Sequence, residues 1–153
     1  MIDEKLESLG IELSAPPKPA GAYIPVVISN NLAYVSGQIP MKDGKIIYEG
    51  KVTNENIEEA KKSAKLCAIN ILAQLKRELG TLDKILKIVK VSGFVNSEPN
   101  FTQHPKVINA ASELFFEIFG EKGQHTRIAV GVSSLPLNSM TEIDVVVEIK
   151  QEK

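Results

Sequence analysis

The sequence is poor in several residue types, and each scarcity excludes a class of protein. It contains one cysteine, Cys67, and no tryptophan. A single cysteine excludes an internal disulfide framework and fits a reducing compartment, so we expect a cytoplasmic protein. The two histidines and the cysteine are widely spaced and form no cluster with metal-ligand spacing, so no metal site is expected.

Neither charge nor hydrophobicity is in excess. The formal net charge is -1, so the chain has no excess of positive charge that would favour binding to nucleic acid or to an anionic membrane. No apolar run approaches the roughly 20 residues of a membrane span, and the acidic start "MIDEKLESLG" is unlike a signal peptide. The 153 residues are 43% hydrophobic and 24% charged, which predicts one domain over 1–153. Residues 1–20 of that domain form an N-terminal helix and a Pro-rich segment.

The pattern of apolar and turn residues predicts an α+β domain. A short helix over 3–10 is expected to end at Gly10 and to be followed by an extended Pro-rich segment. Eight further elements are expected in the order βββαβαββ, at 23–29, 32–40, 46–52, 53–80, 85–96, 104–120, 126–132 and 141–150. The helix over 53–80 carries an apolar stripe that includes Cys67. Because no histidine or basic helix terminus lies near it in sequence, Cys67 is predicted to be a core residue rather than a nucleophile.

Two long helices and a mixed sheet favour helices packed on one face of the sheet. The last strand alternates accordingly. Its apolar side consists of Ile143, Val145, Val147 and Ile149, and its other side of Glu142, Asp144, Val146 and Glu148. The other sheet face then has no helix cover but still leans apolar, which favours burial against copies of the same chain.

Arginine is scarce as well, with two residues against sixteen lysines, and one of the two lies in a strand-like run. The strand over 126–132 has one face of Ile128, Val130 and Val132, expected to meet the helices, and one of Arg127, Ala129 and Gly131, expected to point away from them. Small residues beside a guanidinium leave a concavity. The planar guanidinium can bind a carboxylate through two parallel hydrogen bonds. The alternative is a surface arginine, or one paired with a sheet carboxylate.

Four segments resemble, in order, those of the reactive intermediate deaminase (Rid, YjgF-type) family. "GAYIPVV" is similar to its Gly-Pro-Tyr strand, and "YVSGQIP" to its Ser-Gly-Gln-Ile-Pro strand. "VINAASELFFEIFG" resembles its Val-Asn-Ala-x-Tyr-x-x-Phe-Phe helix. "TRIAVGVSSLPLNSMTEIDVVVEI" resembles its Ala-Arg-Ser-x-Val-x-Val-x-x-Leu-Pro stretch and the Glu-x-Glu strand that follows. The matches run from Gly21 to Ile149, and the length of "NSEPNFTQHPKV" points to a longer-chain branch.

The resemblance implies a chorismate-mutase-like subunit that forms a homotrimer with pockets between its subunits. It also implies hydrolysis of 2-imino or 2-enamino acids to 2-keto acids and ammonia, with no metal or cofactor. Arg127 matches the arginine that holds the substrate carboxylate. Glu142 matches the glutamate that positions or activates water, and Tyr23 matches the pocket tyrosine.

Four further residues match substrate-binding positions of the family, namely Ser36, Gly37, Asn109 and Ala129. Each assignment has a structural alternative: a bulge for Gly37, local helix hydrogen bonding for Asn109, and plain strand residues for Glu142 and Tyr23. Ala129 stands where many members have cysteine, and it retains the backbone N–H.

The sequence also departs from the family pattern. Ala22 replaces the usual proline before Tyr23, and Ser112 stands where the helix usually has tyrosine. "GQHTR" replaces the more common Phe-Pro-Ala-Arg, which places His125 either at the pocket rim or in a solvated loop.

Two other function classes remain open. One is a non-catalytic trimer, a sensor or scavenger, that binds small carboxylic acids through the same arginine. The other is RNA cleavage, against which the slightly negative charge and the lack of a basic stripe with interleaved aromatics both argue.

Overall fold

A five-stranded mixed sheet lies at the centre of the computed structural model, which describes residues 1–19 and 21–151. Its strands lie in the order β1-β2-β7-β5-β6. Their bounds are Val26–Ser29 for β1, Leu32–Gln38 for β2, Ile85–Asn96 for β5, Thr126–Val132 for β6 and Thr141–Ile149 for β7. β5 and β6 are parallel, and the other pairs are antiparallel. Ala20 of the predicted Pro-rich segment and residues 152–153 lie outside the described residues.

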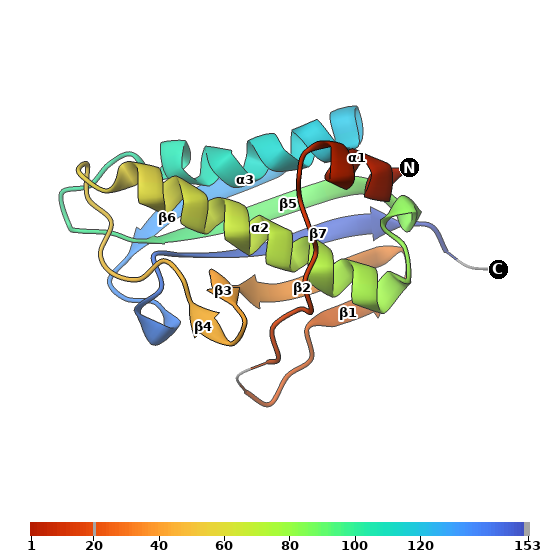
Figure 1. Ribbon diagram of the computed structural model, residues 1–153, viewed down its shortest axis with the longest axis horizontal. Coiled ribbons are helices and arrows are strands. Elements are labelled where there is room, and N and C mark those ends of the chain that lie inside the picture. The colour runs from red at the N-terminus through yellow and green to blue at the C-terminus, as the bar shows by residue number, and fades with distance from the viewer. Residues whose placement is uncertain (20, 152–153) are drawn as a thin grey trace.

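The long helices α2 (Ile57–Leu79) and α3 (His104–Phe119) lie side by side on one face of this sheet (Figure 1). The short helix α1 (Ile2–Ser8) comes before the Pro-rich segment. Gly80 ends α2 with a φ of 82°, a conformation that favours glycine. The predicted α+β fold, a mixed sheet with its helices on one face, is confirmed.

The predicted third strand over 46–52 is wrong. A separate hairpin of β3 (Met41–Lys42) and β4 (Lys45–Ile46) takes its place. Asp43 and Gly44 turn this hairpin with φ values of 52° and 77°. The chain beyond β4 makes only isolated bridges, at Glu49 and Val52, because it runs along the end of the sheet rather than within it.

The core lies between the helices and the sheet. On β7 the side chains alternate as predicted, with the apolar set buried against α2 and the set that begins at Glu142 only partly buried. Cys67 has no exposed surface, and burial raises the pKa of its thiol to about 12. The prediction that Cys67 is a core residue is therefore confirmed.

The prediction of which β6 side chains face the helices is wrong, because the two sets are exchanged. Arg127 pairs with Val91 of β5, and Val91 is fully buried on the side covered by the helices. Gly131 faces the same way, because a Cβ there would lie 2.4 Å from His104 Nε2 of α3. Ile128 instead lies on the uncovered face and is 49% exposed. The small residues of β6 therefore make room for α3 and do not form a hollow on the uncovered face.

The uncovered sheet face carries exposed apolar side chains at the edge opposite β6 as well. Val27 and Tyr34 pair across β1 and β2, and each leaves nearly half of its surface in contact with solvent. This face retains the apolar character that the sequence predicted. No helix in the described part of the chain is long and apolar enough to cross a membrane.

Candidate functional site

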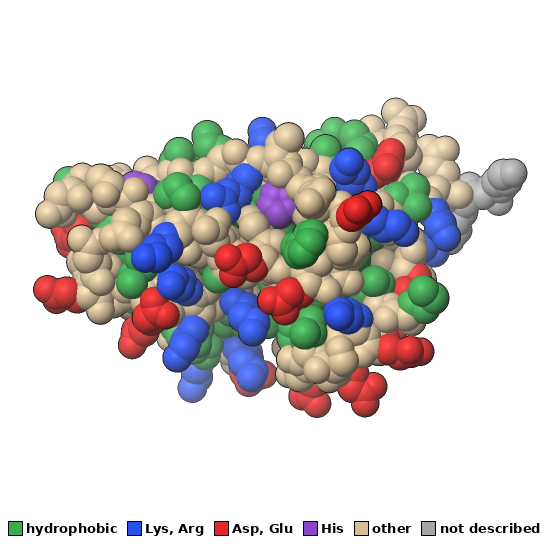
Figure 2. Space-filling model, turned by 90° about the horizontal axis from the view of Figure 1, so that it is seen from above, with side chains coloured by type: hydrophobic (Ala, Val, Ile, Leu, Met, Phe, Trp, Pro, Cys, Tyr) green, Lys and Arg blue, Asp and Glu red, His purple; other side chains and the backbone are tan. Residues whose placement is uncertain are grey.

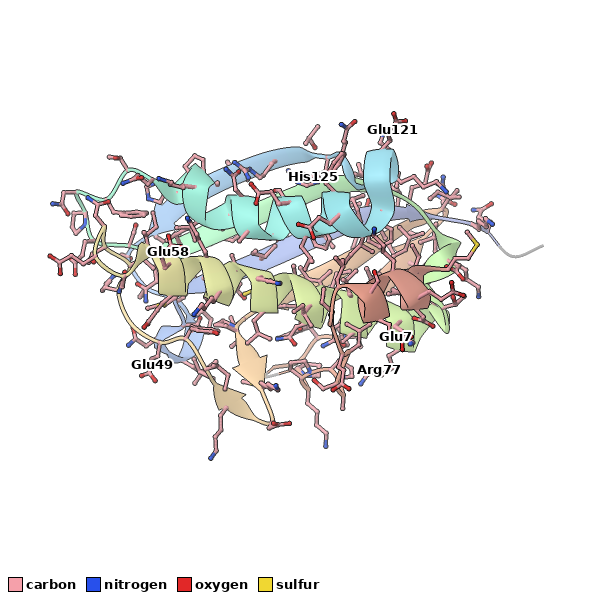
Figure 3. All side chains as sticks on the ribbon, turned by 45° about the horizontal axis from the view of Figure 1, so that its top comes forward. Glu7, Glu49, Glu58, Arg77, Glu121 and His125 are labelled. Carbon is pink, nitrogen blue, oxygen red and sulfur yellow. The ribbon has the colours of Figure 1, made fainter. Side chains whose placement is uncertain are left out.

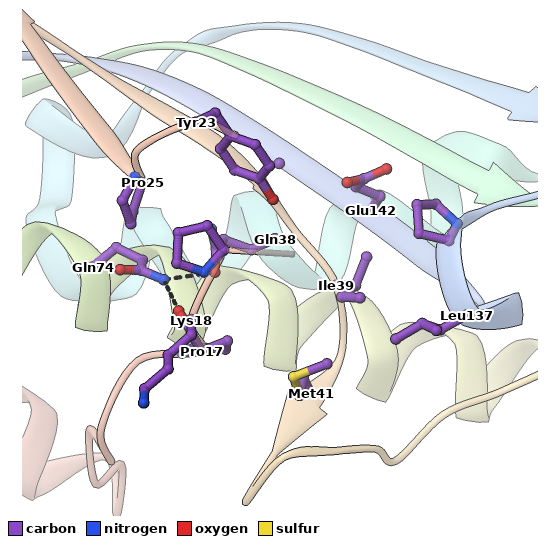
Figure 4. A pocket seen from close by; sticks show the side chains of 13 residues that line it. Pro17, Lys18, Tyr23, Pro25, Gln38, Ile39, Met41, Gln74, Leu137 and Glu142 are labelled. Atoms are coloured by element: carbon purple, nitrogen blue, oxygen red, sulfur yellow. Dashed lines mark hydrogen bonds between the residues drawn. The ribbon is translucent and has the colours of Figure 1, made fainter. Parts of the chain in front are cut away.

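A cavity of about 410 Å³ opens at the end of β2, beside β7 (Figure 4). Its walls come from the Pro-rich segment, the chain around β1 and β2, helix α2 and the turn before β7. The lining residues are Pro17, Lys18, Pro19, Tyr23, Pro25, Gly37, Gln38, Ile39, Met41, Gln74, Pro136, Leu137 and Glu142. Most of these side chains are apolar, so the carboxylate of Glu142 is a conspicuous charge in this cavity.

Glu142 reaches the cavity across a bulge in β2. The register between β2 and β7 shifts between Val35 and Gln38, and Gly37 lies inside that shift. A Cβ on Gly37 would lie 2.6 Å from Glu142 Oε2, so only glycine leaves room for this carboxylate. Burial raises the pKa of Glu142 above its usual value, and the nearby charge of Asp144 raises it further.

Tyr23 forms another part of the cavity wall, with half of its surface exposed. In Figure 4 its ring lies on the same side of the cavity as the Glu142 carboxylate. Ser36 does not line the cavity. Its hydroxyl donates to the Ile24 carbonyl at 2.9 Å and its backbone N–H to the Pro25 carbonyl at 2.8 Å. Ser36 thus fixes the segment that carries Tyr23 and has no direct place in the wall.

Two glutamines of the cavity wall were missed by the sequence analysis. Gln74 Nε2 donates to the Pro17 carbonyl at 2.8 Å and to Gln38 Oε1 at 3.2 Å, which ties the Pro-rich segment and β2 to α2. One turn earlier, Asn70 Nδ2 donates to the carbonyls of Ile39 and Met41. Amide side chains four residues apart within a buried helix were the available signal.

Arg127 lies elsewhere, under the edge of α3. Its Nη1 donates to Asn109 Oδ1 at 2.7 Å and to Ser112 Oγ at 3.2 Å. In the described part of the chain Arg127 makes no ion pair, and its Nε and Nη2 make no hydrogen bond to protein. Arg127 is partly buried, and its guanidinium is held at one nitrogen, so donors are left for an anion.

His125 belongs to this same group of side chains. Its Nε2 lies 2.8 Å from Ser112 Oγ, and its Nδ1 lies 2.6 Å from the Gly123 carbonyl. Figure 3 shows His125 beside α3. The structure therefore places His125 in a packed cluster next to Arg127 rather than in a solvated loop.

The structure divides the predicted site residues into two groups. Tyr23, Gly37 and Glu142 share the cavity, whereas Asn109 and Arg127 meet under α3. Ala129 lies in neither group and packs against the core.

The strand register explains this division. Arg127 pairs with Val91, and Val91 pairs with Val145 on the covered face of the sheet. Glu142 lies three residues before Val145 and points to the opposite face. One chain therefore cannot bring the Arg127 guanidinium and the Glu142 carboxylate to one small ligand.

Neither group of described residues forms a metal site. Across residues 1–19 and 21–151, no cluster of three or more histidine, cysteine, aspartate or glutamate side chains is arranged to hold a metal ion.

Residues 3–149 match the family model described as "YjgF/chorismate_mutase-like, putative endoribonuclease". The chain is 39% identical to protein TCP17 of Trypanosoma cruzi, over 94% of this chain and 91% of that one. It is 30% identical to a 2-iminobutanoate/2-iminopropanoate deaminase of Dermatophagoides farinae, over 88% and 91% of the two chains. The crystal structure of Atu1372 from Agrobacterium tumefaciens, a protein of unknown function, superposes with a TM-score of 0.91 at 46% identity, covering 97% of this chain and 92% of that one. The chain therefore belongs to the YjgF (Rid) family that its motifs predicted.

Proposed function

We propose that this protein hydrolyses reactive 2-imino or 2-enamino acids to 2-keto acids and ammonia. In this proposal Arg127 holds the substrate carboxylate, and Glu142 places the attacking water. The observation that carries the proposal is the partly buried Arg127 guanidinium, which has no carboxylate partner within the described residues. A charge held in this way is matched by a small carboxylic acid.

Asn109 and Ser112 support this role by fixing the guanidinium. Both accept from Nη1, so the plane of the guanidinium is set before any ligand arrives. The fork of Nε and Nη2 then offers two parallel donors to a carboxylate. Lysine at this position would keep the charge but lose the fork.

Glu142 suits the water-placing role because of its surroundings. An imine carbon is already electrophilic, so the reaction needs mainly orientation, a placed water and proton transfer. In the proposed reaction the Glu142 carboxylate takes a proton from water as the water oxygen bonds to the imine carbon, and it passes this proton to the imine nitrogen, which gives a carbinolamine. The carboxylate then takes the proton of the carbinolamine hydroxyl and passes it to the amino group as the C–N bond breaks, so ammonia leaves and the 2-keto acid remains. The raised pKa of Glu142 brings the carboxyl closer to the range in which it exchanges protons near neutral pH.

The proposal needs two chains, because Arg127 and Glu142 point to opposite faces of one sheet. A homotrimer with pockets between subunits, as the family resemblance implies, would bring the Arg127 of one copy to the cavity of another. The apolar side chains on the uncovered sheet face, such as Tyr34 and Ile128, supply surface for this association. The cytoplasmic location stays a prediction alongside it.

A sensor or scavenger that only binds carboxylic acids is the second candidate. The observation that favours it is the same separation, since the Arg127 cluster is complete within one chain without Glu142. RNA cleavage is not favoured, because acidic and basic side chains are mixed on the face seen in Figure 2 and no basic stripe crosses it.

The test is a deamination assay with an imine made in place. An amino-acid oxidase with catalase generates the 2-imino acid, and semicarbazide traps what the protein does not hydrolyse. We expect the protein to lower the amount of semicarbazone that forms and to increase the rate of ammonia release. Binding of 2-ketobutyrate without any acceleration would leave the sensor as the function.

A further inference from the structure

Ser112 has a second contact besides the one that fixes Arg127: it forms a hydrogen-bonded chain with His125, which has no role in the proposed imine chemistry. The Gly123 carbonyl can only accept a hydrogen bond, so the His125 Nδ1 at 2.6 Å from it carries the proton. The neutral ring then has its lone pair on Nε2, which accepts from the Ser112 hydroxyl at 2.8 Å. A serine, a histidine base and an acceptor that fixes the tautomer therefore stand in line.

Arg127 completes the arrangement from the other side of the hydroxyl. Its Nη1 donates to Ser112 Oγ at 3.2 Å, so a positive charge faces the oxygen whose proton the imidazole receives. Such a charge stabilises the negative charge that develops on Ser112 Oγ as its proton leaves. Burial lowers the pKa of His125, and the Arg127 charge lowers it further, which keeps the ring neutral and able to accept a proton at pH 7.

Ser112 and His125 also border a surface groove. It has a volume of about 450 Å³, and its lining is Ser112, Glu113, Phe116, Glu117, Gly123, Gln124 and His125. Phe116 is 51% exposed and offers an apolar surface to a bound molecule. The two glutamates disfavour an anionic ligand, and an uncharged molecule avoids that repulsion.

Both residues depart from the family pattern noted above. Ser112 replaces a tyrosine of the helix, and His125 belongs to the "GQHTR" segment before the strand. The two departures lie 13 residues apart in sequence and meet through one hydrogen bond.

We propose that Ser112 and His125 form an acyl-transfer centre that hydrolyses small neutral carboxylic esters at this groove. Ser112 Oγ bonds to the carbonyl carbon as its proton passes to His125 Nε2. The ester C–O bond breaks, and the alcohol leaves with that proton. Water then attacks the acyl-serine and gives a proton to Nε2. The bond between the acyl carbon and Ser112 Oγ breaks, Oγ takes the proton back from Nε2, and the carboxylic acid is released.

The chain offers an internal control, because its other histidine is also bonded to a serine. Ser97 Oγ lies 3.2 Å from His104 Nε2. Among the described residues no carbonyl accepts from His104 Nδ1 and no arginine donates to Ser97 Oγ. This pair therefore lacks both the tautomer-fixing acceptor and the stabilising charge, and we expect no acylation there.

The experiment uses 4-nitrophenyl acetate with the full-length protein. We expect release of nitrophenolate and an acetyl group on Ser112 in peptide mass maps of the quenched reaction. Ser112→Ala and His125→Gln should each lower the protein-dependent rate by about 10²-fold or more, whereas Ser97→Ala should leave it unchanged. Circular dichroism checks that the variants are folded.

The position of the acetyl group on the wild-type protein tests the proposed acylation of Ser112 independently of any variant. An acetyl group found on lysines or on Ser97, with none on Ser112, would overturn the proposal. A rate that is the same in folded Ser112→Ala would do so as well. Both assays are run on His125→Gln and on Glu142→Gln, because each of these residues belongs to one of the two proposed sites. Loss of ester hydrolysis alone in the first and of imine hydrolysis alone in the second separates the two sites.

Discussion

The cavity around Glu142 and the cluster around Arg127 are built in opposite ways. The cavity has mostly apolar walls around one carboxylate, whose pKa is raised by burial. The cluster is a polar network in which Arg127 is held by Asn109 and Ser112. One region is suited to proton transfer and the other to anion binding, and they face opposite sides of the sheet. In the function proposed above, this difference is the reason why one working site needs two copies of the chain.

The largest effect is expected from the cavity side. Glu142→Gln keeps the shape of the side chain but removes the proton acceptor, so kcat for imine hydrolysis should fall by about 10²- to 10⁴-fold. Affinity for 2-ketobutyrate, measured by calorimetry, should change only a few-fold. Asp144→Asn is the matched control, because it removes a neighbouring carboxylate on the same side of β7. Equal, small changes in kcat and affinity for Glu142→Gln would make Glu142 a scaffold residue.

The cluster side should give the complementary result. Arg127→Ala removes two charge-assisted hydrogen bonds to the ligand, so affinity for 2-ketobutyrate should fall by about 10²-fold or more. Arg127→Lys should recover only part of this loss. Arg77→Ala, at the other arginine of the chain, is the control and should bind normally. Size-exclusion chromatography should show the same oligomer throughout, and an unchanged affinity for Arg127→Ala would contradict the assignment.

Gly37 tests how closely the cavity fits its carboxylate. Gly37→Ala places a methyl group 2.6 Å from the present position of Glu142 Oε2, so the carboxylate must move. We expect a loss of about 1–3 kcal/mol in the free energy of unfolding, as for other overpacked sites, together with slower hydrolysis. Urea unfolding and the imine assay measure the two effects. A variant with wild-type rate would show that the position of the carboxylate is not critical.

The smallest effect concerns stability and pH. The pKa of Glu142 is raised in the folded state, so the folded protein holds this proton more tightly than the unfolded chain. Stability is therefore lost as pH rises from the ordinary value of about 4.5 through the raised one. Glu142→Gln has no such loss, so its Tm should exceed the wild-type Tm at pH 7 and approach it in acid. The rate of imine hydrolysis should rise over the same pH window as Glu142 ionises.

The fold was largely readable from the sequence, and its errors have physical causes. Alternation located the strands over 85–96 and 126–132 because both are regular and flanked by turn residues. For the strand over 126–132, the prediction of which side chains face the helices was wrong. An edge strand can place its apolar side on an uncovered sheet face, and the sequence does not identify that face. The segment over 46–52 is rich in strand-forming residues, yet the tight turn at Asp43 and Gly44 leads it out of the sheet.

The site was readable residue by residue, but its arrangement was not. Tyr23 and Glu142 were expected in one pocket and do line one cavity. Arg127 was expected beside them, and only the strand register shows that one chain keeps it on the other face. The contact of Ser112 with His125 depends on tertiary packing of α3 against the chain before β6, which no local pattern encodes.

Subunit complementation tests the central claim most directly. Arg127→Ala and Glu142→Gln chains, each inactive alone, are unfolded together and refolded as a mixture. If each working pocket takes its arginine and its glutamate from different copies, random mixing at equal amounts should restore about a quarter of the pockets and of the wild-type imine hydrolysis. Mixed oligomers that form, as verified by native mass spectrometry, but recover no activity would contradict the account.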